Sequence, residues 1–295
     1  MSDLKAWLKQ RQEEVDSALN AYLPRKNASP KTIHEAMRYS LFAGGKRLRP
    51  IICLAAAEAC GGEYDDAIAP ACAVELMHTY SLVHDDLPCM DDDDLRRGRP
   101  TSHVVYGEGI AVLTGDALLT EAFLILADTP SNKRYSTKDY LEEFAFAGGS
   151  RKLIGGQILD LEGENKPLKK AQLVKIHEAK TAALLTSSLR LGGMAGNATP
   201  KKLQALTDFG MNTGLAFQVI DDILDVTQST EKLGKTAGKD ENVNKATYPS
   251  IVGLDASRKE AQRLTRKAMK ALDAFPGKKA DRLREIAEYL LNRDY

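Results

Sequence analysis

Residues 65–86, with the sequence DDAIAPACAVELMHTYSLVHDD, are the stretch that decides the fold. Their apolar residues fall on more than one face of a helix, as in Ala71–Val74, and such helices are usually buried in the centre of a larger bundle. Most other segments between glycines and prolines are long and rich in Ala, Leu, Glu and Lys, which favours helix. Strand signals are few. The sequence therefore predicts an all-α fold, with residues 1–295 in a single domain.

Glycine and proline mark the expected helix ends. Ser29-Pro30 is typical of a helix start, Gly44-Gly45 of its end, and Gly61-Gly62 of the end of the next helix. The other predicted helices cover 50–60, 65–86, 108–127, 137–147, 168–190, 201–226, 256–273 and 280–292.

Composition excludes several classes of protein. The 295 residues include 41 basic and 41 acidic side chains, so there is no basic excess of the kind that indicates nucleic-acid binding. No uncharged apolar stretch approaches the roughly 18 residues that span a bilayer, and the first residues do not resemble a signal peptide. The four cysteines lack Cys-x-x-Cys spacing, which predicts reduced thiols and a cytoplasmic location.

Two acidic clusters interrupt these apolar helices. The first holds six aspartates in the ten positions 85–94 and is followed at once by Arg96 and Arg97. The second contains Asp221 and Asp225, four residues apart on one helix face. Buried carboxylates repel each other unless a cation pairs them. A solvated loop or internal salt bridges would explain one such cluster, but two favour metal binding.

The ligand type indicates which metal. Oxygen ligands without neighbouring cysteines or paired histidines favour magnesium or calcium over zinc. Magnesium is commonly bound by one or two carboxylates together with substrate phosphates. Basic residues near the acids, above all in GGKRLRP at 44–50, would add charge for a phosphate, although this segment lacks the spacing of a Walker A loop. We therefore expect magnesium ions that bridge a diphosphate between the two clusters.

Five motifs together carry a family resemblance: GGKRLRP at 44–50, the run 85–99, Gly155-Gly156-Gln157, Lys180-Thr181 and 218–225. With them the chain resembles the trans-isoprenyl diphosphate synthases over nearly its whole length, and within that family it is most like the bacterial farnesyl diphosphate synthases. The resemblance implies an isoprenoid synthase-type helical bundle around a central cavity, and a homodimer.

The activity that the resemblance implies is prenyl transfer. Dimethylallyl or geranyl diphosphate would be ionised with the help of magnesium, condensed with isopentenyl diphosphate, and would lose a proton to give (2E,6E)-farnesyl diphosphate. Asp85, Asp91 and Asp221 would bind the metal, three ions with substrate bound, while direct ligation by Asp86 and Asp225 is left open.

The resemblance also implies which residues hold the two substrates. The isopentenyl diphosphate residues would be Gly45, Lys46, Arg49, His78 and Arg97. The allylic diphosphate residues would be Arg96, Lys180, Gln218, Lys235 and Lys245. Lys180, Thr181 and Gln218 would act as the catalytic residues. Tyr80, five positions before Asp85, would stop growth at fifteen carbons, beside the small Ser81.

Four rival interpretations remain at this stage. A geranylgeranyl diphosphate synthase is the nearest, because it belongs to the same family. A class I terpene cyclase would have no use for Lys46 and Arg49, and a metal phosphohydrolase built around His84-Asp85 needs more metal-binding histidines than this chain's five offer. A regulatory subunit without activity would typically lack one of the two aspartate clusters.

Overall fold

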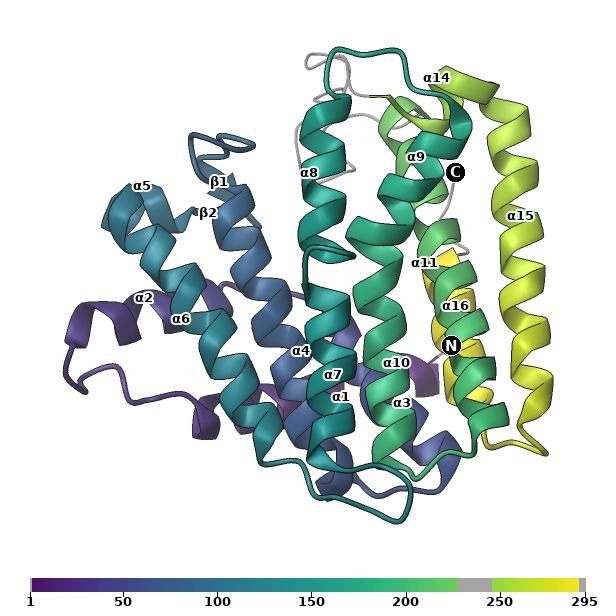
Figure 1. Cartoon of the computed structure of the whole chain (residues 1–295), viewed down its shortest axis with the longest axis horizontal. Helices are drawn as coiled ribbons and strands as arrows, with labels where there is room; N and C mark the ends of the chain where they lie inside the picture. The colour runs from purple at the N-terminus through teal and green to yellow at the C-terminus, as the bar shows by residue number, and fades with distance from the viewer. Residues whose placement is uncertain (1, 228–245, 292–295) are drawn as a thin grey trace.

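The computed structural model describes residues 2–227 and 246–291, and this part of the chain is almost entirely helical (Figure 1). A short antiparallel hairpin joins β1 (Leu95–Arg96) to β2 (Arg99–Pro100), with Leu95 opposite Pro100. The helices are α1 Ser2–Tyr22, α2 Lys31–Leu41, α3 Leu48–Cys60, α4 Tyr64–Asp85, α5 Ser102–Tyr106, α6 Glu108–Ala127, α7 Thr137–Gly148, α8 Leu153–Gly163, α9 Lys170–His177, the π-helix η1 Glu178–Ala182, α10 Ala183–Ala195, α11 Pro200–Thr227, α14 Tyr248–Val252, α15 Leu254–Ala271, the 3-10 helix η2 Leu272–Ala274 and α16 Asp281–Leu291.

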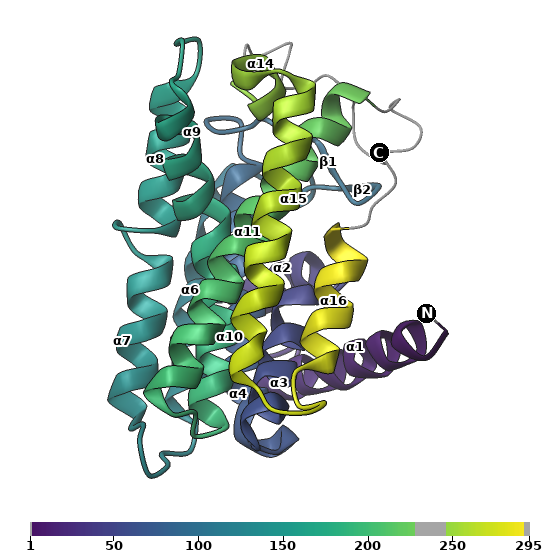
Figure 2. The ribbon, with the colours of Figure 1, turned by 90° about the vertical axis from the view of Figure 1, so that its right-hand side faces the viewer.

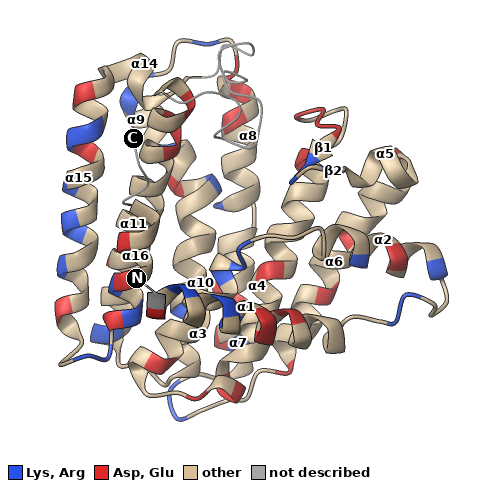
Figure 3. Cartoon of the chain, turned by 180° about the vertical axis from the view of Figure 1, so that it is seen from behind, with Lys and Arg blue, Asp and Glu red and all other residues tan. Residues whose placement is uncertain are grey.

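Helix α4 lies in the middle of the bundle and packs against α3, α6 and α10. Its buried side chains include Ala71, Cys72, Ala73 and Val74 in succession, so it buries all of its faces. Helix α15 is different, because it buries a narrow stripe and carries charged residues along its outer side (Figure 3). The predicted all-α fold, with the 65–86 segment as a central helix, is confirmed.

Several predicted boundaries were wrong. Helix α2 begins at Lys31 with Pro30 as its N-cap, one residue later than predicted, and ends at Leu41, before the glycine pair. The single helix predicted at 168–190 consists of α9, η1 and α10 and extends to Ala195. Helices α1 and α8 were missed, and α8 contains the glycine pair Gly155-Gly156, which is typical of a helix break. Helix α3 does end where glycine predicts, with Gly61 in the left-handed region at φ 99°.

Helix α6 is more apolar than we expected from the sequence. Among the described helices it is the one whose length and composition would allow it to cross a membrane. This is weak evidence for a span, because α6 contains Asp116 and Glu121 and packs along α4. It does leave large apolar side chains exposed, among them Leu113 and Leu124.

The carboxyl ends of α4 and α11 lie at the same end of the bundle, where β1 and α14 are also found (Figures 1 and 2). Asp85 is the last residue of α4, and Asp221 lies in the last two turns of α11. The fold thus brings the two acidic clusters to one end of the molecule.

Candidate active site

Five residues predicted to bind isopentenyl diphosphate line one cavity of about 820 Å³, which we call the basic cavity. Gly45 and Lys46 come from the segment between α2 and α3, Arg49 from the first turn of α3, His78 from α4 and Arg97 from the β1–β2 hairpin. Side chains of α1 and α16 complete its wall. The structure therefore brings together, around one space, residues that lie 52 positions apart in the sequence (97 − 45).

The glycine pair before α3 allows Arg97 to approach the backbone. Arg97 Nη1 donates a hydrogen bond to the carbonyl oxygen of Gly44. Gly45 has φ 132°, and a Cβ built there would lie 2.4 Å from Arg97 Nη1. A side chain at position 45 would be strained and would displace Arg97. The Gly45 carbonyl oxygen accepts a hydrogen bond of 3.0 Å from Gln12 on α1.

The basic cavity carries concentrated positive charge. Burial lowers the pKa of His78 well below its usual range, and Arg49 and Arg97 lower it further, so the imidazole is neutral near pH 7. Burial also lowers the pKa values of Arg49 and Arg97, but arginine stays charged in proteins. Such a site suits a ligand with several negative charges.

A second cavity, of about 420 Å³, adjoins the first, and we call it the apolar cavity. Leu153, Ile154, Ile158, Leu161 and Leu184 form much of its wall. Five of the predicted residues also line it: Tyr80, Ser81, Asp85, Lys180 and Thr181. Arg49 and His78 border both cavities, so the two spaces meet at these side chains.

Tyr80 is held in the wall of the apolar cavity. It is 5% exposed, and its ring meets His84 edge-on with 5.7 Å between centroids. His84 Nε2 lies 2.9 Å from the carbonyl oxygen of Val112 on α6. Burial, with a smaller influence of Asp85, raises the pKa of Tyr80 to about 12, so the phenol stays protonated.

Lys180 and Thr181 belong to the π-helix η1, a local widening that is often found at functional sites. Gly156 on α8 and Gly214 on α11 lie against its backbone, and a Cβ on Gly156 would come within 2.4 Å of the Lys180 nitrogen. Lys180 Nζ donates to Asp160 Oδ2 at 2.7 Å. The two glycines and Asp160 thus fix the direction of Lys180.

The first acidic cluster is built at the end of α4. The backbone N–H of Asp91 donates to the Asp85 carbonyl oxygen at 2.8 Å, which places these two predicted metal ligands next to each other. Asp86 is paired with a cation of the protein, because Arg96 Nε donates to its two carboxylate oxygens at 2.7 and 2.9 Å. Arg96, predicted to hold the allylic diphosphate, pairs here with Asp86.

In the second acidic cluster, Asp222 has a structural role. Asp222 is buried and accepts a hydrogen bond of 2.8 Å from the backbone N–H of Tyr248, at the start of α14. Asp221 and Gln218 line neither of the two cavities. Within residues 2–227 and 246–291, no three acidic, histidine or cysteine side chains lie close enough together to form a metal site by themselves.

The acidic residues nevertheless fit magnesium. Burial raises the pKa of Asp85 to about 6, with Asp91 adding to the shift and Lys180 opposing it. A nearby cation would favour the ionised carboxylate. Magnesium needs only one or two carboxylates when substrate phosphates and water complete its coordination. The neighbouring Asp85 and Asp91 supply oxygen donors of that kind, and ligation by Asp221 stays a prediction.

Two predicted substrate residues, Lys235 and Lys245, lie outside the described residues. Other residues that shape the site were missed by the sequence analysis. Glu75 lies in the apolar middle of α4, Asp160 lies in the second half of α8, and Gln12 lies in the missed helix α1. The only sequence signal for such residues is a polar side chain within an otherwise apolar segment, and this signal does not identify the partner of that side chain.

Comparison with known proteins identifies the family. The polyprenyl synthetase profile matches residues 30–289. A chloroplastic geranylgeranyl pyrophosphate synthase from Capsicum annuum is 47% identical over 294 residues, covering 99% of this chain and 79% of the relative.

Solved structures agree with this assignment. The apo structure of an FPP/GFPP synthase from Zymomonas mobilis has a TM-score of 0.85 and 34% identity, over 98% of this chain and 99% of the other. The structure of a geranyltransferase from Helicobacter pylori, complexed with magnesium and isoprenyl diphosphate, has a TM-score of 0.83 and 36% identity, over 97% of this chain and 96% of the other. Together with the all-α bundle and the two adjoining cavities, these matches show that the chain belongs to the polyprenyl synthetase family, as a trans-prenyl diphosphate synthase.

Proposed function

We propose that this prenyl diphosphate synthase condenses dimethylallyl or geranyl diphosphate with isopentenyl diphosphate, and that farnesyl diphosphate is its main product. One observation carries the condensation: the basic and apolar cavities meet at Arg49 and His78. A small, strongly charged substrate suits the basic cavity. An allylic diphosphate suits the apolar cavity, with its chain among the leucines and its diphosphate towards Asp85 and Lys180.

The reaction begins with the break of the allylic carbon–oxygen bond, which leaves a carbocation and a diphosphate anion. Lys180 lies where it can donate to that anion as charge develops, and donors fixed in advance are the most effective. Asp85, Asp91 and Asp221 would hold magnesium, which supplies Lewis-acid stabilisation of the leaving group when bound. The carbocation is shielded from water by the leucine and isoleucine wall.

Condensation then joins the two substrates. The double bond of isopentenyl diphosphate attacks the allylic carbon, a new carbon–carbon bond forms, and a proton leaves the adjacent carbon. The departed diphosphate can accept this proton, so the site needs no strong general base. Neutral His78 and charged Arg49 lie at the junction of the cavities and orient the isopentenyl diphosphate.

The product length follows from Tyr80. The chain must grow away from Asp85, along α4, and Tyr80 lies five residues, somewhat more than one helical turn, from it. Its ring, supported by His84 and α6, would block further growth. This supports farnesyl diphosphate.

Geranylgeranyl diphosphate is the second candidate, and the curated relatives support it better. The Capsicum annuum relative, 47% identical along nearly this whole chain, is named a geranylgeranyl pyrophosphate synthase. The FPP/GFPP synthase from Zymomonas mobilis shows that the fold also serves other product lengths.

Product analysis distinguishes the candidates. The enzyme is incubated with magnesium, dimethylallyl diphosphate and excess isopentenyl diphosphate, and the products are separated after removal of phosphate. We expect farnesol as the main alcohol. Geranylgeraniol as the main product would establish the second candidate, and a lack of any condensation product would refute prenyl elongation.

We further propose that the enzyme acts as a homodimer in the cytoplasm. The exposed apolar side chains of α6, including Leu113 and Leu124, form a surface that a second copy would cover. The four cysteines are free thiols, which suits a reducing compartment.

A further inference from the structure

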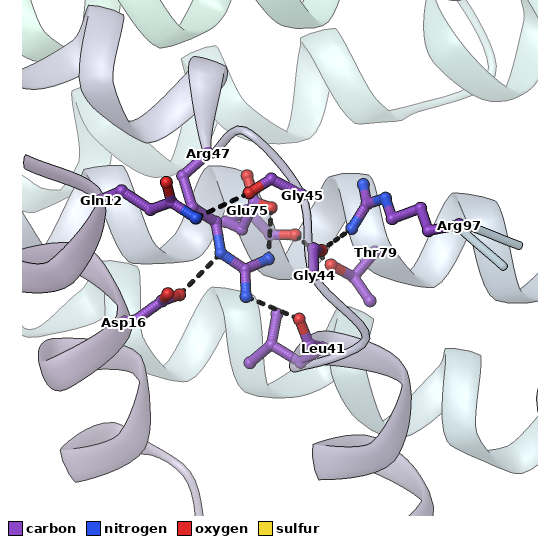
Figure 4. Close-up of polar contacts among 9 residues, drawn as sticks. All are labelled: Gln12, Asp16, Leu41, Gly44, Gly45, Arg47, Glu75, Thr79 and Arg97. Atoms are coloured by element: carbon purple, nitrogen blue, oxygen red, sulfur yellow. Dashed lines mark hydrogen bonds and ion pairs between the residues drawn. The ribbon is translucent and has the colours of Figure 1, made fainter. Parts of the chain in front are cut away.

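Arg47 behaves differently from the other basic residues of the 44–49 segment. Lys46 is exposed, whereas Arg47 is 3% exposed. Each of its three side-chain nitrogens donates a hydrogen bond within the protein (Figure 4): Nε to Asp16 Oδ1 at 2.7 Å, Nη1 to Glu75 Oε1 at 2.8 Å and Nη2 to the Leu41 carbonyl oxygen at 2.7 Å. A diphosphate could bind this guanidinium fully only by displacing those acceptors.

The backbone of Arg47 is also unusual. It has φ 48° in the left-handed region, immediately before α3. That conformation costs a residue with a side chain about 1–2 kcal/mol, and it persists only where the surroundings impose it. Asp16 and Glu75 provide such surroundings, because they hold the guanidinium from two helices at once.

The contacts of Arg47 join three elements beside the basic cavity. Asp16 lies on α1, Leu41 is the last residue of α2, and Glu75 is a buried residue of α4. Arg47 itself stands between Lys46 and Arg49, both of which line the basic cavity. A shift of Arg47 would therefore change the direction of the side chains on each side of it.

We propose that Arg47, held by Asp16 and Glu75, is a positioning residue that aims Lys46 and Arg49 into the basic cavity without itself binding the diphosphate. This inference rests on the proposed function, in which the basic cavity binds isopentenyl diphosphate. It makes α1 a part of the substrate site, although α1 contributes neither an allylic ligand nor a metal ligand.

If Arg47 were instead a direct ligand of the diphosphate, changes at Asp16 would not weaken the binding of isopentenyl diphosphate. Asp16→Ala and Asp16→Asn both remove a negative charge near an anion site. If only charge mattered, or if Arg47 bound the diphosphate, both changes would leave affinity for isopentenyl diphosphate unchanged or improve it. In a positioning role the acceptor matters, and only Asn keeps an oxygen for Arg47 Nε.

The test compares these two variants with wild type in the full-length enzyme. Binding of isopentenyl diphosphate alone is measured by calorimetry, and the KM values for both substrates by steady-state assay. We expect Asp16→Ala to weaken isopentenyl diphosphate binding about fivefold or more, which is less than the loss of a direct hydrogen bond to a charged group because Asp16 acts through Arg47. Asp16→Asn should recover most of that loss, and the KM for the allylic diphosphate should change less than twofold.

Asp208→Ala is the matched control, because Asp208 is exposed on α11 and its carboxylate accepts a hydrogen bond from the neighbouring Gln204. A merely structural effect would lower the melting temperature and the active fraction without changing either KM. Equal weakening by Ala and Asn, no weakening by Ala, or equal rises in both KM values would overturn the positioning role. Binding of isopentenyl diphosphate by the wild type is measured first. If the wild type bound none, the proposed function would fail as well.

Discussion

At the scale of single residues, Arg49 and His78 stand apart because they border both cavities. Burial lowers the pKa of each, but with different results. Arg49 keeps its charge and can bind phosphate oxygens, whereas neutral His78 can give one hydrogen bond and accept another. The positive charge at the junction therefore comes from Arg49.

The two cavities predict separate effects of two substitutions. Arg97 lines only the basic cavity of the pair and Lys180 only the apolar one. Arg97→Ala should raise the KM for isopentenyl diphosphate about 10- to 100-fold, the range for losing a hydrogen bond to a charged group, with a small change for the allylic substrate. Lys180→Ala should do the reverse and also lower kcat.

Steady-state assays with each substrate varied in turn measure these effects, with Lys138→Ala on α7 as a control for loss of an exposed lysine. If Arg97→Ala and Lys180→Ala raised both KM values equally, the assignment of one substrate to each cavity would be wrong.

The raised pKa of Asp85 predicts that the affinity of the enzyme for magnesium depends on pH. The pKa of this carboxyl is raised to about 6, mainly by burial, and magnesium binds the ionised carboxylate. One unit below that pKa, about a tenth of the carboxylate is ionised. Apparent magnesium affinity should therefore fall about tenfold between pH 7 and pH 5.

Magnesium titrations of activity at several pH values, with diphosphate saturating, provide the measurement. Asp85→Asn should bind magnesium weakly and lose most of the dependence around pH 6. An affinity that stayed constant down to pH 5 in the wild type would show that Asp85 does not compete for protons as described.

The sequence predicted much of the site at this scale because its residues occur in short runs. GGKRLRP and the aspartate clusters could be found without a structure. Glu75 and Asp16 could not, because neither belongs to a recognisable motif, and the partner that they share, Arg47, depends on how α1 and α4 pack. Their role follows only from the three-dimensional contacts.

At the scale of elements, helix propensity predicted most helices but not their interruptions. The π-helix η1 divides the segment that was predicted as one helix. Its backbone is approached by Gly156 and Gly214, so its form depends on α8 and α11 rather than on its own residues. The sequence of 168–190 alone contains no sign of this widening.

In the proposed function, Tyr80 at the contact between α4 and α6 limits the length of the product. Removal of the Tyr80 ring should open the apolar cavity along α4 and shift the products to twenty carbons or more. Tyr80→Phe keeps the ring and should keep the wild-type product. Chromatography of the dephosphorylated products gives the length, and thermal unfolding gives the cost of the cavity, about 3–5 kcal/mol for a large buried aromatic.

A folded Tyr80→Ala enzyme with the same product as wild type would transfer the length limit to other residues of the apolar cavity. If wild type already made twenty carbons, Tyr80 would have no limiting role, and the second candidate function would stand.

At the scale of the whole molecule, the first and last described helices, α1 and α16, meet at the basic cavity. Lys5 and Gln12 of α1 and Ile286 and Tyr289 of α16 line it together. Arg282 Nη2 also donates to Asp3 Oδ2 at 2.9 Å and joins the two helices. This closure was beyond prediction from sequence, because α1 was missed and because pairing of distant helices depends on packing.

The exposed side of α6 predicts the oligomeric state. Leu113 and Leu124 are eleven residues apart, close to three helical turns, and therefore share a face. Their side chains are 55% and 62% exposed. We expect a dimer in solution and expect Leu124→Lys to shift it towards monomer, since a lysine would be buried without a partner.

Light scattering after size-exclusion chromatography gives the mass, and Leu95→Lys in the β1–β2 hairpin is a control for an exposed leucine elsewhere. A wild-type monomer at micromolar concentration, or a Leu124→Lys dimer as stable as wild type, would remove α6 from the interface.

The central claim is that the two adjoining cavities hold the two diphosphates, with magnesium on the allylic side. The most direct measurement is a crystal structure of this enzyme with magnesium, isopentenyl diphosphate and an unreactive thio analogue of dimethylallyl diphosphate. We expect isopentenyl diphosphate beside Arg49 and Arg97, and the analogue beside Lys180 with magnesium bound by Asp85 and Asp221. Isopentenyl diphosphate bound through magnesium at Asp85, or both diphosphates bound in the same cavity, would contradict it.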